Sequence, residues 1–278
     1  MNKKTLAVLL LAGWAGSASA EGFSSLNIAI DYLNQRRYVD AINWFDKAIA
    51  AGDLNPDQMH VAYLDRGQAR AQLRRPQEAV ADFTEALAIR PNDLTAQIER
   101  SFAYLDDGQI EKAADDMAAA QMTASKIPRI IFYRGLIAWE MGRYSAAAEA
   151  FSGLADTGYT DGWLWLQLAN IKQDKPGTKY GGMRLPNGKI AALGIPYWWP
   201  GPVMSFYAGS NTEGDVLEAM DGEFASQGTE CQGNFYLGAW HLVHGDGTGA
   251  KLLLQKAINA CPAGNIEWRM ATFELKKL

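Results

Sequence analysis

Cysteine and histidine are scarce in this chain, with two cysteines, Cys231 and Cys261, and three histidines, His60, His241 and His244. The two cysteines are too far apart to form the C-x-x-C pair of a disulfide oxidoreductase. The chain also lacks a G-x-S-x-G nucleophile motif and a phosphate-binding glycine loop. We therefore predict that the protein is not an enzyme and needs no cofactor.

The chain also has no excess of basic charge, because it contains 26 Lys and Arg residues and 31 Asp and Glu residues. An acidic chain without a basic stripe is repelled by phosphate backbones, so a nucleic-acid partner is not expected. Beyond the first 20 residues, no apolar run is long enough to span a bilayer.

The first 20 residues have the pattern of a secretory signal peptide. Lys3 and Lys4 precede an apolar run over residues 5–14, and small residues follow at 18–20. We expect cleavage before Glu21 and a periplasmic location. An uncleaved membrane anchor is the alternative. Because no cysteine stands at the cleavage point, the pattern is not that of a lipoprotein.

A motif of small and aromatic residues recurs at intervals of 34 residues. With Gly67 at position 8 of such a unit, Ala79, Phe83 and Pro91 fall at positions 20, 24 and 32. This unit resembles a tetratricopeptide repeat (TPR) at its signature positions. Similar units begin near Gly22, His60, Leu94, Pro128 and Cys231.

Each TPR is a pair of antiparallel helices, A and B, in which small residues at positions 8 and 20 let the helices cross closely. The resemblance therefore implies an all-α TPR solenoid of about five repeats. We expect an N-terminal array over 21–171, an insertion over 172–202, and a C-terminal repeat pair over 203–278 that ends in a capping helix over 265–275. Residues 162–171 are expected to form a further helix A.

The insertion over 172–202 is rich in proline and glycine, which break helices. Its residues 183–191 could pair as a small hairpin around Asn187-Gly188. Near its end stand Trp198 and Trp199. They either fill the space of a missing helix B or form exposed anchors for a partner.

The C-terminal part resembles the NlpI family of TPR lipoproteins. The similarity rests on Phe206-Tyr207-Ala208-Gly209, Asn234 to Gly238, Gly245-Asp246, and Glu267 to Leu275. It implies a dimeric adaptor that brings a periplasmic protease to a cell-wall enzyme. This chain departs from the family, because it has no lipidation cysteine and carries the insertion.

His241 and His244 are three residues apart, a spacing at which a helix can present two metal ligands on one face, with Asp246 just beyond. However, His241 falls at position 11, a core position, and His244 falls in the following turn. Without a clear third ligand, we expect satisfied histidines and no metal.

In TPR proteins, helix-A positions 2, 5, 9 and 12 line the concave surface. Here these positions are almost entirely apolar, and Arg129 is the only basic residue among them. We predict a groove for an apolar partner, such as an amphipathic helix. The alternatives are that a second subunit or the insertion covers these residues, or that the protein is a homo-oligomerising structural module. The predicted groove residues are Phe23, Leu26, Ile30, Leu33, Val61, Leu64, Ile98, Phe102, Leu105, Arg129, Phe132, Leu136 and Trp139.

The two cysteines have positions that favour a disulfide. Cys231 is expected at the start of helix A of the last repeat, and Cys261 just past the end of its helix B. Because the two helices run antiparallel, these ends lie side by side, within reach of the roughly 5.5 Å Cα separation of a disulfide. An exported protein meets an oxidising compartment, so we predict a Cys231–Cys261 bond. Two reduced, buried thiols are the alternative.

Overall fold

The computed structural model describes residues 21–155, 159–173, 199–222, 225–262 and 264–278, and every regular element among them is a helix. Two compact units divide the chain, unit 1 over Met1–Ser125 and unit 2 over Lys126–Leu278. No described helix combines the length and the apolar character needed to cross a membrane. The all-α prediction is confirmed. The signal peptide, Trp198 and the suggested hairpin lie outside the described residues.

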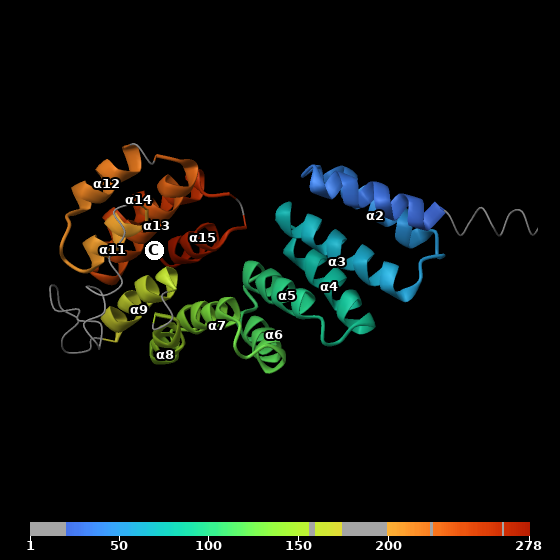
Figure 1. Cartoon of the computed structure of the whole chain (residues 1–278), viewed down its shortest axis with the longest axis horizontal. Helices are drawn as coiled ribbons and strands as arrows, with labels where there is room; N and C mark the ends of the chain where they lie inside the picture. Colours follow the sequence, from blue (N-terminus) through green and yellow to red (C-terminus); the bar gives the residue numbers. More distant parts are fainter. Residues whose placement is uncertain (1–20, 156–158, 174–198, 223–224, 263) are drawn as a thin grey trace, which may run out of the picture. The chain divides into compact units, whose positions relative to one another are not determined.

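Unit 1 consists of three successive helix pairs (Figure 1). The pairs are a helix over residues 21–34 with α2 (Tyr38–Ala50), α3 (Pro56–Gln72) with α4 (Pro76–Ile89), and α5 (Leu94–Asp106) with α6 (Ile110–Thr123). Local sequence starts these helices. Asn55 and Gln58 form a reciprocal capping box before α3, and Pro56 occupies its first turn. The Asp93 side chain caps α5 by accepting from the Ala96 amide.

Close crossing of the helices explains the small residues at position 8. A Cβ atom added to Gly67 would lie 2.7 Å from Phe83, and one added to Gly135 would lie 2.4 Å from Phe151. Real side chains do not approach so closely. The aromatic ring at position 24 therefore packs directly on the backbone of helix A, which fixes the geometry of the repeat.

Position 15 has the same left-handed backbone in all five repeats. Its φ angle is 59° at Arg36 and 58° at Arg74, and it is 77°, 70° and 84° at Gly108, Gly142 and Gly245. This conformation ends helix A and turns the chain into helix B. Glycine adopts it freely, whereas the two arginines hold a conformation that L-residues seldom take.

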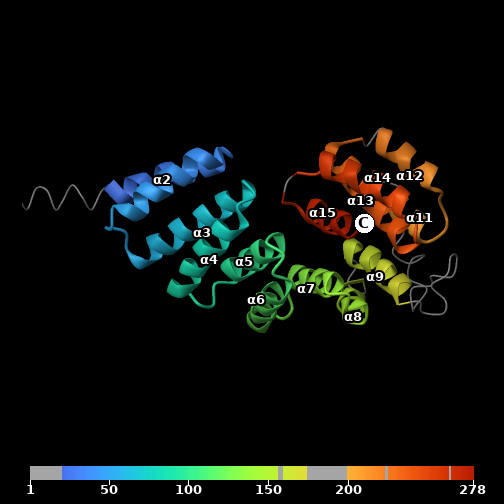
Figure 2. The same ribbon diagram turned by 180° about the vertical axis from the view of Figure 1, so that it is seen from behind.

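Unit 2 begins with the fourth repeat, α7 (Pro128–Glu140) and α8 (Tyr144–Ala155), followed by α9 (Thr160–Lys172). After the insertion come α11 (Gly201–Tyr207), α12 (Glu213–Asp221), the pair α13 (Gln227–Val243) and α14 (Gly247–Ala260), and α15 (Ile266–Lys277). Seen from behind in Figure 2, α15 lies beside α13. The predicted helix A over 162–171 is therefore present as α9.

Aromatic side chains form the core of unit 2. The Trp165 ring centroid lies 5.2 Å from that of Trp139, 5.8 Å from Phe151 and 5.7 Å from Phe235. These residues come from α7, α8, α9 and α13, so one ring cluster joins the fourth repeat to the last. In addition, the Tyr236 hydroxyl donates to Asp161 at 2.8 Å.

The compact units part between Ser125 and Lys126, whereas the proline-rich insertion follows residue 171. Composition marks where helices break and not which helices pack together. Helix α9 packs on α13 through Trp165 and Asp161, so the fourth repeat belongs with the C-terminal repeats.

Helix α13 starts earlier than the repeat pattern indicates. It begins at Gln227, where Ser226 and Thr229 form a capping box, so Cys231 lies within the helix and not at its start. Cys261 caps the end of α14, and the structure joins the two cysteines in a disulfide with Cα atoms 4.6 Å apart. The bond connects the second turn of one helix to the C-cap residue of its antiparallel partner.

Candidate protein-binding surface

The helix-A face of unit 1 comprises repeat positions 2, 5, 6, 9, 12 and 13 in the first three repeats. These positions recur at the three- and four-residue spacing that places side chains on one side of a helix. Ten of the side chains are apolar, four are amides, one is threonine and three are acidic. They are Phe23, Leu26, Asn27, Ile30, Leu33, Asn34, Val61, Leu64, Asp65, Gln68, Ala71, Gln72, Thr95, Ile98, Glu99, Phe102, Leu105 and Asp106.

The predicted groove residues of unit 1 differ in exposure. Phe23 is 49% exposed, while Ile30, Leu33, Val61 and Leu64 are half-buried and pack along their edges on the cores of the first repeats. The accessible apolar surface is therefore in repeats one and two. The remaining predicted residues of unit 1 are buried, and they are Leu26, Ile98, Phe102 and Leu105.

In unit 2, the corresponding apolar residues are buried by the chain itself. Phe132, Leu136 and Trp139 are each at most 3% exposed. The Trp139 indole N–H donates to Oε1 of Glu274 in α15 at 2.6 Å. Arg129 is exposed, and its guanidinium lies over the Tyr133 ring. The C-terminal helix thus covers Trp139. The sequence had suggested a second subunit or the insertion as the element that covers this face.

Helix α15 was expected to cap the array, and most of its side chains are buried against other helices of unit 2. Glu267, Arg269 and Glu274 are each no more than 9% exposed, although a cap would direct such residues to solvent. Helical periodicity alone cannot show that α15 reaches back to α7. The only sequence signal is the pair Glu274 and Lys277, which lie one turn apart.

Charged side chains join α15 to α7. Nζ of Lys277 lies 2.8 Å from Oε2 of Glu140 and 3.4 Å from Oε1 of Glu274. Burial and the neighbouring Glu274 carboxylate raise the pKa of Glu140 from its ordinary 4.5 to about 7, and Lys277 only partly opposes this. One lysine thus serves two buried carboxylates, which makes this contact sensitive to pH.

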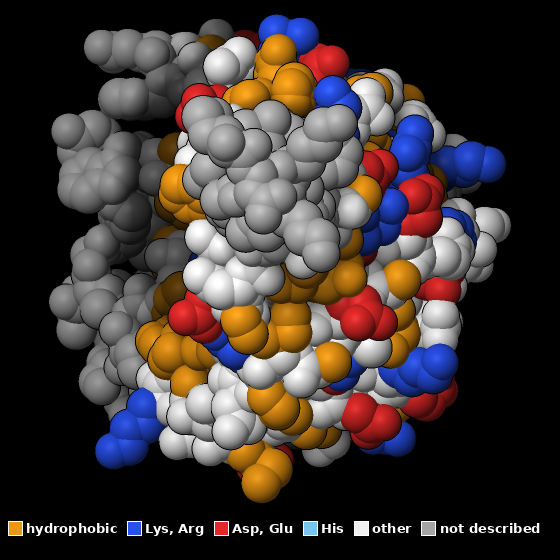
Figure 3. Space-filling model, turned by 90° about the vertical axis from the view of Figure 1, so that its right-hand side faces the viewer, with side chains coloured by type: hydrophobic (Ala, Val, Ile, Leu, Met, Phe, Trp, Pro, Cys, Tyr) orange, Lys and Arg blue, Asp and Glu red, His pale blue; other side chains and the backbone are white. Residues whose placement is uncertain are grey.

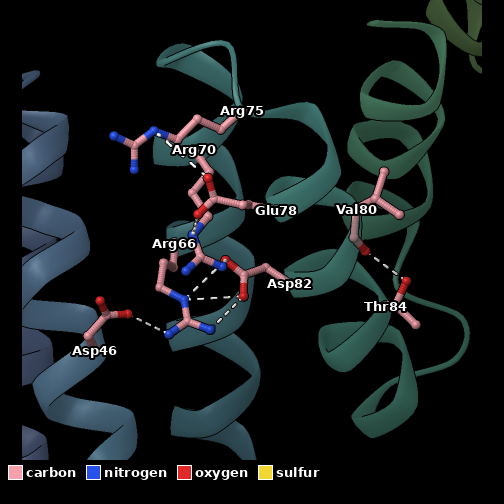
Figure 4. A network of polar contacts seen from close by, with 8 residues as sticks. All are labelled: Asp46, Arg66, Arg70, Arg75, Glu78, Val80, Asp82 and Thr84. Atoms are coloured by element: carbon pink, nitrogen blue, oxygen red, sulfur yellow. Dashed lines mark hydrogen bonds and ion pairs between the residues drawn. The ribbon is translucent and has the colours of Figure 1, made fainter. Parts of the chain in front are cut away.

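An arginine–aspartate ladder joins the repeats of unit 1, and Figure 4 shows its part around Arg66. The Arg66 guanidinium contacts Asp82 at 2.6 Å and Asp46 of the preceding repeat at 2.6 Å. Arg100 contacts Asp116 at 2.7 Å and Thr84 of the preceding repeat at 3.2 Å. Each arginine therefore connects helix B of its own repeat to helix B of the one before.

The repeat period itself contained the signal for this ladder. Arg66 and Arg100 are both at position 7, and Asp82 and Asp116 are both at position 23. The signature positions of the repeat are small or aromatic and do not include these charged residues. Asp82 is only 2% exposed and also pairs with Arg70 at 2.8 Å, so the ladder is largely a structural element.

Asp65 has a different environment. It is half-buried on the helix-A face of unit 1, and no described side chain donates to it or pairs with it. Burial raises the pKa of this carboxyl to about 6. A half-buried carboxylate without a described partner is stabilised by any cation that a ligand places beside it.

The aromatic and histidine candidates of unit 2 have partners within that unit. The Trp199 indole N–H donates to Gln232 at 2.7 Å, and the ring rests against Gly233. Nδ1 of His241 faces Asp246 at 2.7 Å, and its Nε2 faces Glu213 at 3.0 Å. His241 is half-buried, because its ring reaches across to α12.

The polar partners of the two histidines are different. Nδ1 of His244 lies 2.7 Å from the Trp240 carbonyl, whereas both ring nitrogens of His241 face carboxylates. Burial would lower the pKa of His241, but Glu213 and Asp246 outweigh it and raise the pKa. Among the described residues, no three His, Cys, Asp or Glu side chains are placed to hold a metal ion.

Comparison with known proteins agrees with this architecture. Residues 26–94 and 64–130 match the family described as "Tetratricopeptide repeat". The chain is 37% identical over 78 residues to "Tetratricopeptide repeat protein 28" of Mus musculus, which is 28% of this chain and 3% of that protein. It is 32% identical over 93 residues to "58 kDa phosphoprotein" of Plasmodium berghei, which is 34% of this chain and 21% of that protein. It therefore spans a small part of these relatives' length.

Solved structures share the fold. A tetratricopeptide repeat protein from Parabacteroides merdae superposes with a TM-score of 0.59 at 18% identity, covering 92% of this chain and 99% of that one. The "APC/C hetero-tetramer Cut9-Hcn1" gives 0.51 at 13% identity, covering 92% of this chain and 42% of that one. TPR proteins generally mediate protein–protein interactions, and the repeats, the helix crossings and these matches together show that this chain has an all-α TPR fold.

Proposed function

We propose that the protein is an exported adaptor that captures a segment of another protein on the helix-A face of unit 1. The observation that supports this proposal is the difference in exposure between equivalent positions. Ile30 and Leu33 are half-buried with apolar surface open to solvent, whereas Leu136 and Trp139, at the same repeat positions in unit 2, are buried. Exposed apolar surface of this kind is typical of an interaction site.

Export rests on the N-terminal pattern and is supported by the disulfide. Lys3, Lys4 and the small residues at 18–20 flank the apolar run, and a Cys231–Cys261 bond requires an oxidising compartment. We propose a periplasmic location. The similarity to NlpI lipoproteins further suggests a periplasmic protease or cell-wall enzyme as partner. N-terminal sequencing that finds Met1 on the mature chain would contradict the export proposal.

A pair of matched substitutions tests the binding face. Phe23 is 49% exposed on the helix-A face, and Met122 is 89% exposed near the end of α6, a helix B. Envelope proteins that crosslink to the wild-type protein are expected not to crosslink to the Phe23→Asp variant. They should still crosslink to the Met122→Asp variant. If the two variants crosslink to the same proteins as the wild type, the helix-A face is not the binding surface.

The same variants examine the alternative of a homo-oligomerising module. Light scattering on the purified protein measures its mass in solution. If Phe23→Asp dissociates a dimer and changes no other interaction, the face serves self-association and the adaptor proposal fails.

A further inference from the structure

The helix-A face of unit 1 is uniform in the sign of its charge. Its six positions in three repeats include no lysine or arginine, and its charged residues are Asp65, Glu99 and Asp106. All three are half-buried, and they stand among apolar side chains such as Val61 and Leu64. The face therefore offers an incoming chain both apolar contacts and negative charge.

The arginines of α3 and α5 cannot neutralise Asp65. Arg66 and Arg70 are held by Asp82 (Figure 4), and Arg100 is held by Asp116. To turn toward Asp65, an arginine would have to abandon a carboxylate that is almost completely buried, and such a loss is strongly destabilising. The ladder thus keeps the basic residues on one side of α3 and α5.

Charges of both signs lie on the side of the molecule seen in Figure 3. There, Lys and Arg side chains are interspersed with Asp and Glu. A mixed surface attracts no partner of a particular charge, whereas a face with acidic groups and no basic ones selects positive ligands. Asp65 is the focus of this selection, because burial raises its pKa to about 6 and no described side chain pairs with it.

We propose that the segment captured on the helix-A face of unit 1 is basic and amphipathic, with a Lys or Arg side chain that pairs with Asp65 while apolar side chains cover Ile30, Val61 and Leu64. This inference rests on the proposed function and defines the chemistry of its partner. It excludes a segment recognised by its terminal carboxylate, which would need basic residues on this face.

The test uses three fluorescent peptides with identical leucine positions and with Lys, Gln or Glu at all others. Their binding to the mature, disulfide-bonded protein is measured by anisotropy at pH 7.5. We expect the Lys peptide to bind about tenfold more tightly than the Gln peptide, and the Glu peptide to bind most weakly. Added salt should weaken binding of the Lys peptide selectively.

Two matched variants distinguish recognition from general attraction to an acidic protein. Asp65→Asn removes one charge from the helix-A face, and Glu85→Gln removes one from the exposed side of α4. Asp65→Asn should weaken the Lys peptide about fivefold to tenfold, and Glu85→Gln should change it less than twofold. Equal effects of the two variants would overturn the proposal.

The remaining outcomes separate this inference from the function on which it rests. If the Gln or Glu peptide binds as tightly as the Lys peptide and Phe23→Asp weakens it, the face is a binding surface and the charge inference is wrong. If no peptide binds, both the inference and the proposed binding face fail.

Discussion

The two units are stabilised in different ways, although both are built from the same kind of repeat. In unit 1, ion pairs recur with the repeat period, Arg66 with Asp82 and Arg100 with Asp116. In unit 2, the position-23 acid of the fourth repeat is replaced by Ala150. A ring cluster around Trp165 connects the fourth repeat to the last, and a disulfide joins the two helices of the last repeat. The periodic unit leaves part of its helix-A face open, while the aperiodic unit covers its own with α15.

This difference suggests that unit 1 serves binding and that unit 2 serves stability. A regular array can be read by a partner along its length, because equivalent positions recur in each repeat. In unit 2, helix-A residues make contacts within the unit, such as the hydrogen bond from Trp139 to Glu274. We therefore expect substitutions in unit 2 to act mainly on stability, and substitutions on the open face of unit 1 to act mainly on binding.

The largest effect should come from the ring cluster of unit 2. Trp165→Ala removes a side chain that is 1% exposed and contacts rings from three other helices. We expect a loss of about 3–5 kcal/mol in the free energy of unfolding, since large-to-small changes leave a cavity. Hydrogen exchange should show the loss of protection in unit 2. Equal loss in α3 and α4 would contradict the separate stabilisation of the two units.

Removal of the disulfide should have the next largest effect. The bond closes a loop with a sequence separation of 30 residues, so replacing both cysteines by serine should cost about 3 kcal/mol. Urea denaturation of the double variant measures this loss. Thiol labelling of the unfolded, unreduced wild type should find no free thiol, and two free thiols per chain would disprove the bond.

The ladder of unit 1 should contribute less. Asp82→Asn leaves Arg66 and Arg70 without a buried carboxylate, and we expect it to cost about 2 kcal/mol. Asp46→Asn is the control, because the Asp46 side chain is 50% exposed and such pairs contribute under about 1 kcal/mol. Equal losses in urea denaturation would show that burial does not govern the ladder.

The smallest effect concerns the contact between α7 and α15. Because the folded pKa of Glu140 is about 7 against an ordinary 4.5, the folded state binds this proton more tightly than the unfolded state. The free energy of unfolding should therefore fall as pH rises from about 4.5 to 7, by on the order of 1–2 kcal/mol. Glu140→Gln should flatten this dependence in denaturation curves at pH 5 and pH 8. A variant with the same slope as the wild type would assign the dependence to another group.

The sequence predicted the repeats well, because their signature residues are local. Gly67 and Phe83 mark a helix crossing within one repeat, and the 34-residue period places the other pairs. The surface was predicted less completely. Phe102 and Trp139 have suitable positions in their repeats, yet both are buried. Their position in a repeat fixes the side of the helix but not what packs against that side.

By itself, the sequence determined the all-α class, the helix pairs and the residues of the crossings, because these depend on contacts between residues less than one repeat apart. Only the tertiary structure decided that α9 joins the C-terminal repeats and that α15 folds back onto α7. Those contacts join residues as distant as Trp139 and Glu274, which are 135 positions apart. No local periodicity specifies such pairings, since they depend on which buried faces and charges remain after each helix pair has formed.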